Sequence, residues 1–236
     1  MNIKAASITN PGGKAINDDT VRLYQKDGTC VFVGDGLGGY AGGQQASQAA
    51  AAAMMQFSEN LDMEDTASFA AAAAAADEAV RELQERTSGT MKTTLVYLAV
   101  KDGKARWLHV GDSRLYRFRG GRIVNQTRDH SVSQMAVMMG DITPDQIRFH
   151  EDRNRILRAL GAQNAKPEIS RFETVEAGDA FLLCTDGFWE FVFEPEMEAA
   201  LEKAAGPEQW LEEMEKLLLE RIPEGTDNYT AAAVIC

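Results

Sequence analysis

The stretch VFVGDGLGGYAGGQQAS, residues 31–47, joins an apolar strand, an acidic turn and the beginning of a helix. The predicted strand at 29–34 is almost continuously apolar, which is typical of a strand inside a sheet. Asp35 and Gly36 follow at once, so we expect the Asp35 carboxylate to emerge at the rim of that sheet. The glycines that follow let the chain turn before a helix predicted at 44–60.

The other predicted elements are runs of strands followed by pairs of helices. Strands are predicted at 5–9, 19–25, 93–100, 104–110, 114–119, 122–126, 169–175, 180–185 and 230–235. Helices are predicted at 65–87, 194–204 and 208–220, with short helices inside 129–154. Helix pairs that follow strand runs favour an α+β layered fold with mostly antiparallel sheets over a parallel one. Since no linker or repeat interrupts it, we predict a single domain over residues 1–236.

The charge and composition of the sequence argue against several classes of binding partner. The formal net charge of −12 makes nucleic acid or an anionic membrane an unfavourable partner. We expect no signal peptide and no membrane span, because the sequence lacks a sufficiently long apolar run. The three cysteines are widely spaced, which predicts free thiols in a reducing cytoplasm.

Five short motifs place a carboxylate beside glycine, asparagine or serine next to an apolar strand. They are Asn17-Asp18-Asp19, Gly34-Asp35-Gly36, Gly111-Asp112-Ser113, Thr185-Asp186-Gly187 and Asp227-Asn228. Aspartates that converge on one rim would repel each other unless cations lay between them. Carboxylates, carbonyls and water are the ligands of hard divalent ions, so the motifs indicate bound Mg²⁺ or Mn²⁺.

Each motif also has a simpler interpretation. An isolated Asp-Gly pair is usually a turn, and we assign Asp27-Gly28 and Asp102-Gly103 to turns. Asp35 and Asp186 differ because each follows a strand that is predicted to be buried. Together with Asp227-Asn228 they favour a metal site over a set of unrelated turns.

Eight stretches, in order, resemble the bacterial branch of the metal-dependent type 2C serine/threonine phosphatases, the PPM family. They are KAINDD at 14–19, VFVGDGLGGYAGGQQAS at 31–47, TTLVYLAV at 93–100, WLHVGDSRLYRFRGG at 107–121, TRDHS at 127–131, ILRALG at 156–161, GDAFLLCTDGFWE at 178–190 and DNYTAAAV at 227–234. The resemblance implies a four-layer α/β/β/α sandwich, with two central, mostly antiparallel sheets flanked by helix pairs. It also implies a mobile flap at about 130–155.

The resemblance assigns roles to the acidic residues. Asp35 would bridge two metals, and Gly36 would offer its carbonyl to one of them. Asp186 and Asp227 would complete the protein ligands of the other metal. Asp18 and Asp19 would hold metal-bound water or ligate a metal directly. Asp112 would help to bind a weaker third ion. The expected cofactors are two tightly bound Mn²⁺ or Mg²⁺ ions and a weaker third.

A bridging hydroxide between two metals would then attack phosphorus directly, without a phosphorylated enzyme intermediate. Three positions depart from the family pattern. Lys14 replaces the phosphate-binding arginine, Leu37 replaces a histidine proposed as general acid in eukaryotic members, and Lys92 replaces a glycine. Lys14 keeps the charge but lacks the two-pronged guanidinium, and it is either the phosphate contact or a solvated loop lysine. His109 is expected to pack within a strand, and His130 to cap or orient the flap.

The resemblance implies a phosphoprotein phosphatase that acts on phosphoserine and phosphothreonine and reverses a bacterial Ser/Thr kinase. We expect a cytoplasmic monomer whose partner is that kinase or its targets. Two other functions stay open. One is a non-catalytic module that binds phosphoproteins. The other is a two-metal enzyme for nucleotides or small phosphate esters, although the sequence has no P-loop.

Overall fold

Strand β3 (Thr29–Gly34) is buried along its whole length because side chains pack against both of its faces. Val31 and Val33 point into the space between two sheets. Cys30 and Phe32 point the other way, toward a layer of helices. The structure, a computed structural model, describes residues 2–39 and 42–236, so Tyr40 and Ala41 of the first motif lie outside the described residues.

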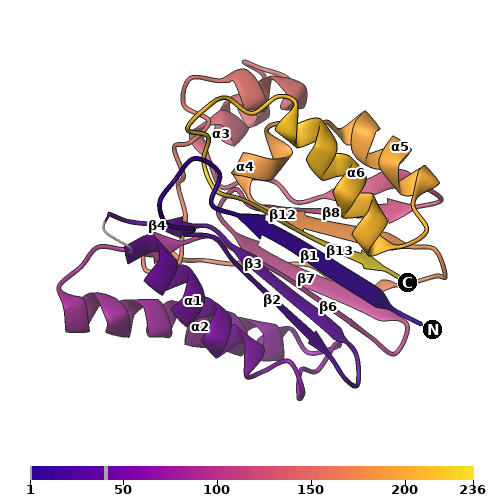
Figure 1. Cartoon of the computed structure of the whole chain (residues 1–236). Coiled ribbons are helices and arrows are strands. Elements are labelled where there is room, and N and C mark those ends of the chain that lie inside the picture. Colours follow the sequence, from indigo (N-terminus) through magenta and orange to yellow (C-terminus); the bar gives the residue numbers. More distant parts are fainter. Residues whose placement is uncertain (1, 40–41) are drawn as a thin grey trace.

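Two antiparallel sheets pack face to face and form the centre of the molecule (Figure 1). One sheet has the order β1-β13-β12-β8-β9. Its strands are β1 (Lys4–Asn10), β13 (Tyr229–Ile235), β12 (Ala180–Cys184), β8 (Arg114–Arg119) and β9 (Arg122–Gln126). The other sheet has the order β10-β7-β6-β3-β2. Besides β3, its strands are β10 (Glu168–Ile169), β7 (Lys104–Val110), β6 (Leu95–Lys101) and β2 (Thr20–Gln25), and β11 (Glu173–Thr174) also pairs with β7.

Helices cover the outer faces of both sheets, which confirms the predicted four-layer α+β sandwich (Figure 1). Helices α1 (Gly42–Met55) and α2 (Thr66–Thr87) pack on the sheet that contains β3. Helices α5 (Glu194–Lys203) and α6 (Pro207–Leu219) pack on the other sheet. No helix within residues 2–39 and 42–236 is long and apolar enough to cross a membrane.

Several predicted boundaries were wrong for local reasons. The strand expected at 169–175 is only the two short strands β10 and β11, because their pairing with β7 is interrupted. The strand expected at 93–100 is split into β5 (Lys92–Thr93) and β6, because the Thr94 N–H donates to the Asp35 carbonyl instead. The helix expected at 44–60 ends at Met55 and continues in tighter turns.

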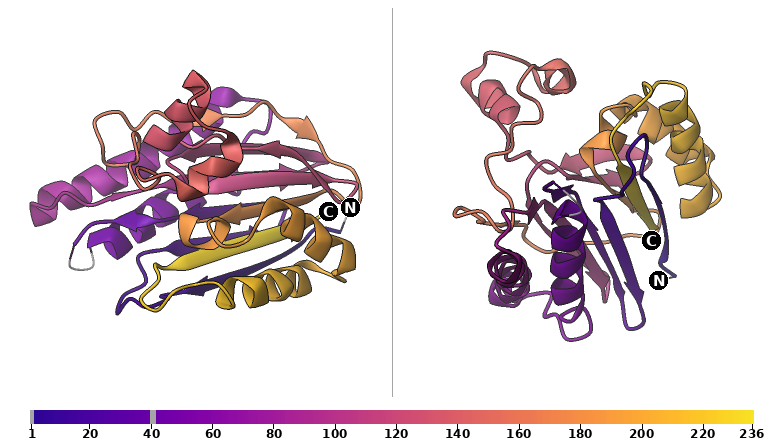
Figure 2. Two further views of the ribbon diagram at one scale, coloured as in Figure 1. Left: turned by 90° about the horizontal axis from the view of Figure 1, so that it is seen from above. Right: turned by 60° about the vertical axis from the view of Figure 1, so that its left-hand side comes forward.

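The flap expected at about 130–155 contains helix α3 (Val132–Met139) and the short 3₁₀ helix η1 (Pro144–Phe149). It lies beyond the strand ends, to one side of the sheets (Figure 2, salmon). A bridge between Ser131 and Ile156 joins the two chain segments that lead into and out of it. The flap is therefore closed at its base by the segments on either side of it.

Candidate metal centre

The predicted acidic residues meet at one end of the sandwich. Asp35 follows β3, Asp112 follows β7 and Asp186 follows β12 as the first residue of the short helix α4 (Asp186–Trp189). The pKa of the Asp35 carboxyl is raised well above its usual range by burial and by neighbouring negative charge. That charge comes from Asp186, Asp19, Asp112 and Asp227. Motifs distant in the sequence therefore share one electrostatic environment.

Asp19 and Asp186 show the same effect. Burial, followed by the charges of Asp186 and Asp227, raises the pKa of Asp19 to about 7, although hydrogen bonds oppose the rise. Burial, followed by the charges of Glu190 and Asp227, raises the pKa of Asp186 to about 7. The Thr185 hydroxyl donates to Asp19 Oδ2 at 2.8 Å, which holds the Asp19 carboxylate beside the start of α4.

Asp112 is the most enclosed member of the cluster, with 2% of its surface exposed. Its Oδ1 atom is buried and makes no hydrogen bond to any residue in the described part of the chain. Burial and the charges of Asp186 and Asp129 raise the pKa of its carboxyl. The Trp189 indole N–H donates to the Asp112 carbonyl at 3.0 Å and fixes its backbone. A buried carboxylate oxygen without a donor is available to a cation.

Gly36 and Asp18 lie where the chain enters α1. The Gly36 N–H donates to the Asp18 carbonyl at 3.2 Å. A Cβ atom at position 36 would lie 2.0 Å from the Gly43 carbonyl oxygen, so only glycine fits. Asp18 Oδ1 accepts from the Gln44 N–H at 2.9 Å, in the first turn of α1. One Asp18 oxygen therefore caps the helix, which leaves the other for a water or an ion.

Two threonines that the sequence analysis gave no role hold Asp35 in place. Thr94 Oγ1 accepts from the Asp35 N–H at 2.8 Å, and the Thr93 hydroxyl donates to the Asp35 carbonyl at 2.9 Å. Thr94 also shares a hydrogen bond of 2.7 Å with Ser113, next to Asp112. Both threonines are fully buried, and a buried Thr-Thr pair at a strand end was the signal that could have identified them.

Lys14 and Asp227 lie at the open edge of the site. Lys14 Nζ is 3.9 Å from Asp227 Oδ1, and the two side chains are 51% and 66% exposed. Asn228 connects this edge to the centre, since its Oδ1 accepts from the Asp18 N–H at 2.8 Å. The structure thus brings Lys14 to the acidic cluster, although an exposed ion pair of this length is weak.

The oxygen donors of the cluster fit a hard divalent cation. Asp35, Asp112 and Asp186 contribute carboxylates that repel each other, and neutralising them requires positive charge. Within residues 2–39 and 42–236, one group of side chains has three potential metal-ligand atoms within 4.8 Å of one another. It consists of His109, His130 and Glu168 rather than of the aspartates. Among these described residues, the ligand atoms of the aspartates do not form such a compact group of three.

Comparisons with known proteins found similar chains. A family model described as protein phosphatase 2C matches residues 12–222. The chain is 33% identical over 178 residues to the serine/threonine protein phosphatase PstP of Mycobacterium tuberculosis, covering 74% of this chain and 34% of PstP. It therefore spans about a third of the length of PstP. It is 31% identical over 196 residues to the protein phosphatase PhpP of Streptococcus pneumoniae, covering 78% of each chain.

A solved structure, the catalytic domain of PstP in complex with two manganese ions, superposes with a TM-score of 0.85 at 28% identity. The match covers 99% of this chain and 97% of that one. The family model spans most of the sequence, and the matched residues include seven of the eight predicted site residues, all but Asp227. The chain belongs to the protein phosphatase 2C family.

Proposed function

We propose that this protein is a metal-dependent phosphatase that removes phosphate from phosphoserine and phosphothreonine in proteins. The observation that carries this proposal is the set of mutually repelling carboxylates of Asp35, Asp112 and Asp186, of which Asp112 is buried and the other two are partly buried. The relatives PstP and PhpP of this chain are named protein phosphatases, which favours this function over hydrolysis of small phosphate esters or nucleotides. A module that only bound phosphoproteins would have no need of uncompensated carboxylates in its interior.

The cofactor we propose is Mn²⁺ or Mg²⁺, with two ions held tightly and a third more weakly. Asp35 would bridge the two tight ions, with the Gly36 carbonyl on one of them. Asp186 and Asp227 would hold the other. The supporting residues would be Asp19, which ligates directly or through water, and Asp18, which acts through the oxygen not used by α1. Asp112 would hold the third.

When bound, the ions lower the pKa of water and neutralise charge on the phosphate oxygens. The protein groups have distinct tasks in direct attack of water on phosphorus. The Thr93 and Thr94 hydroxyls keep the Asp35 backbone fixed while charge develops. Lys14 contacts the phosphate from the open edge. Leu37 has no proton to give, so the leaving oxygen takes its proton from water.

We also propose the biological setting in which this chemistry operates. The substrates would be a bacterial Ser/Thr kinase or the proteins it phosphorylates, and the enzyme would act as a monomer. Residues 1–236 would form one catalytic domain, with the flap at about 130–155 beside the site. The cysteines Cys30, Cys184 and Cys236 are free, which favours the cytoplasm.

A direct test measures phosphate release from a phosphothreonine peptide with Mn²⁺, with EDTA, and with Mn²⁺ restored. We expect activity with Mn²⁺, loss on chelation and recovery on adding metal back. A nucleoside monophosphate at the same concentration serves as the competing substrate. Full activity in exhaustively chelated enzyme would refute the metal mechanism. Faster turnover of the nucleotide would favour the small-ester function, and no turnover of either would favour a binding module.

A further inference from the structure

His130 holds the backbone next to Asp112 with two hydrogen bonds. The backbone N–H of His130 donates to the Gly111 carbonyl at 2.8 Å. Its Nδ1 accepts from the Gly111 N–H at 3.1 Å. One residue at the base of the flap thus engages both peptide groups of Gly111, immediately before a residue of the acidic cluster.

Gly111 has little freedom apart from these contacts. Its φ is +104°, and a Cβ atom there would lie 2.6 Å from Thr94 Cγ2. This conformation turns the chain from the end of β7 into Asp112. On the far side, Trp189 holds the Asp112 carbonyl. The direction of the Asp112 carboxylate therefore depends on a backbone segment that is held at both ends.

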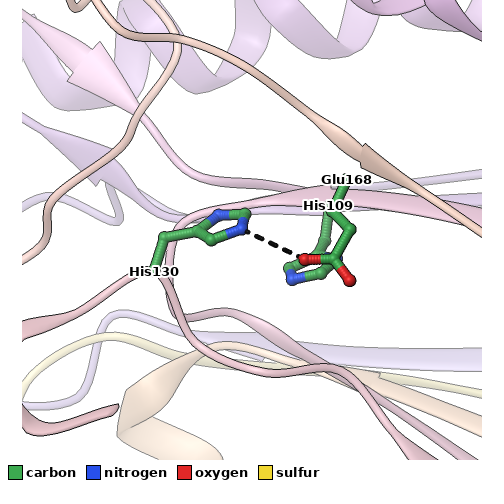
Figure 3. A group of neighbouring side chains, drawn as sticks. All are labelled: His109, His130 and Glu168. Carbon is green, nitrogen blue, oxygen red and sulfur yellow. Dashed lines mark ion pairs between the residues drawn. The ribbon is translucent and has the colours of Figure 1, made fainter. Parts of the chain in front are cut away.

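The surroundings of His130 fix which nitrogen carries the proton. Because Nδ1 accepts from Gly111, neutral His130 carries its proton on Nε2, which lies 3.6 Å from Glu168 Oε2 (Figure 3). The His109 ring stacks on that of His130, with centroids 4.7 Å apart. Burial and the neighbouring His109 lower the pKa of His130 to about 4, which keeps the ring neutral.

The same hydrogen bonds argue against a metal at His109, His130 and Glu168, whose potential ligand atoms lie within 4.8 Å. A neutral imidazole has one nitrogen lone pair. In His130 that lone pair already accepts from the Gly111 N–H, so Nε2 has a proton rather than a lone pair to offer. Metal-binding histidines instead donate a proton from the second nitrogen, as His109 Nε2 does to the Arg128 carbonyl at 2.8 Å.

We propose that His130 is a positioning residue, which aims the Asp112 carboxylate at the metal cluster and couples it to the flap. The coupling runs through the His130 carbonyl, which accepts from the Leu157 N–H at 2.7 Å where the chain leaves the flap. This inference rests on the proposed function, since it takes Asp112 as the ligand of the weaker third ion. Glu168 has a smaller part, because it faces the nitrogen that does not contact Gly111.

Two substitutions separate positioning from simple packing. In His130→Asn, Oδ1 occupies the place of Nδ1 and can still accept from the Gly111 N–H. In His130→Gln, the amide reaches the place of Nε2, and the acceptor near Gly111 is lost. His130→Ala is a second loss variant should the glutamine variant fold poorly. Asp112→Ala is the reference for complete loss of the weak site, and Glu168→Gln is the matched control.

The measurement is Mn²⁺ binding to purified protein by equilibrium dialysis, together with the Mn²⁺ dependence of kcat. We expect His130→Gln and His130→Ala to weaken the third site by about 10- to 100-fold, the usual effect of losing a group that orients a ligand. The two tight sites should stay filled. His130→Asn and Glu168→Gln should stay within about threefold of wild type, well below that range.

Two results would overturn the inference, and they are distinguishable. If wild type binds only two Mn²⁺ ions and kcat shows no weaker phase, then the Asp112 assignment fails and the inference fails with it. If wild type has the weak site but the asparagine and glutamine variants behave alike, whether both normal or both impaired, then His130 acts only by packing and the inference fails alone.

Discussion

Two charged clusters lie next to each other and are built in opposite ways. In the metal cluster, Asp35, Asp112 and Asp186 face one another, and their pKa values are raised. Behind it, Arg114 binds Asp129 with two hydrogen bonds of 2.9 and 2.7 Å. Those two side chains are 3% and 2% exposed, so the pair balances its charge without water.

The contrast separates structural charge from functional charge. The Arg114 guanidinium also stacks on Trp189, 3.4 Å from the ring centroid, and the same ring donates to the Asp112 carbonyl. The paired cluster is thus a rigid support that completes itself within the protein. The metal cluster needs cations to balance its charge. Replacing one of its carboxylates should therefore cost less free energy of unfolding than replacing Asp129 in the paired cluster.

The largest expected effect is on activity. Asp35→Asn and Asp186→Asn keep side-chain shape but each removes a carboxylate charge. We expect activity to fall by at least about 100-fold, beyond the 10- to 100-fold range for residues that only support ligands. Thermal unfolding of the chelated variants should show equal or greater stability than wild type, since repulsion is reduced. Unchanged turnover of both variants at saturating Mn²⁺ would disprove the assignment.

The paired cluster should respond in stability instead. Asp129→Asn removes the carboxylate that accepts two hydrogen bonds from the buried Arg114 and leaves only Glu194, at 3.8 Å, as an anion near it. We expect this to cost about 3–5 kcal/mol of unfolding free energy. Urea denaturation in the presence of EDTA measures this without metal effects. Arg122→Ala is the control, because the Arg122 side chain is exposed and its ion pair with Glu198 should contribute little to the free energy of unfolding. Equal losses in both variants would remove the distinction between the clusters.

The metal cluster should also give the protein an unusual pH dependence. The pKa values of Asp19 and Asp186 rise from 3.8 to about 7 on folding in the absence of metal. Such groups stabilise the fold when protonated, so the stability of chelated protein should fall as pH rises from about 4 to about 7. Metal binds only the ionised carboxylates.

Mn²⁺ should therefore raise Tm by more at pH 8 than at pH 5.5. Differential scanning calorimetry at both pH values, with Mn²⁺ or EDTA, measures the difference. If Mn²⁺ raises Tm by the same amount at both pH values, then protons and metal do not compete for these carboxylates. Asp186→Asn is the matched variant, and its metal-dependent shift should be much smaller at pH 8.

The smallest effect concerns Lys14, which adds positive charge only at the edge of the metal cluster. It meets a phosphate dianion in both ground state and transition state, so Lys14→Ala should raise KM more than it lowers kcat. Its exposure places the loss near the lower end of the roughly 1–3 kcal/mol expected for a charged hydrogen bond. Lys14→Arg should match or improve wild type, since guanidinium contacts two oxygens. An unaltered KM for Lys14→Ala would exclude it from the site.

The sequence predicted the layers and the acidic cluster because both follow from local patterns. Strand β3 is apolar on both faces, and Asp35 follows it directly, while one residue separates Asp112 and Asp186 from the ends of β7 and β12. The contacts that hold those aspartates were not predictable in the same way. The Trp189 bond to Asp112 and the His130 bonds to Gly111 join residues from separate elements, so they depend on how the layers pack.

Short elements escaped prediction for a related reason. Strands β10 and β11 have two residues each, too few to show a periodicity, and they exist only through pairing with β7. The aromatic side chain of Trp189 is buried, with 1% of its surface exposed. Its hydrogen bond to Asp112 adds a role that burial alone does not reveal.

The pairing of the first strand with the last has a consequence for synthesis of the protein. Strand β1 pairs along its whole length with β13, from Lys4 with Ile235 to Asn10 with Tyr229. On the ribosome, β1 must wait for β13, which takes tens of seconds at roughly 5–20 residues per second. The Asp18 N–H likewise waits for Asn228. A nascent chain therefore cannot assemble its metal cluster early, and it remains inactive until residues 228–235 have been made.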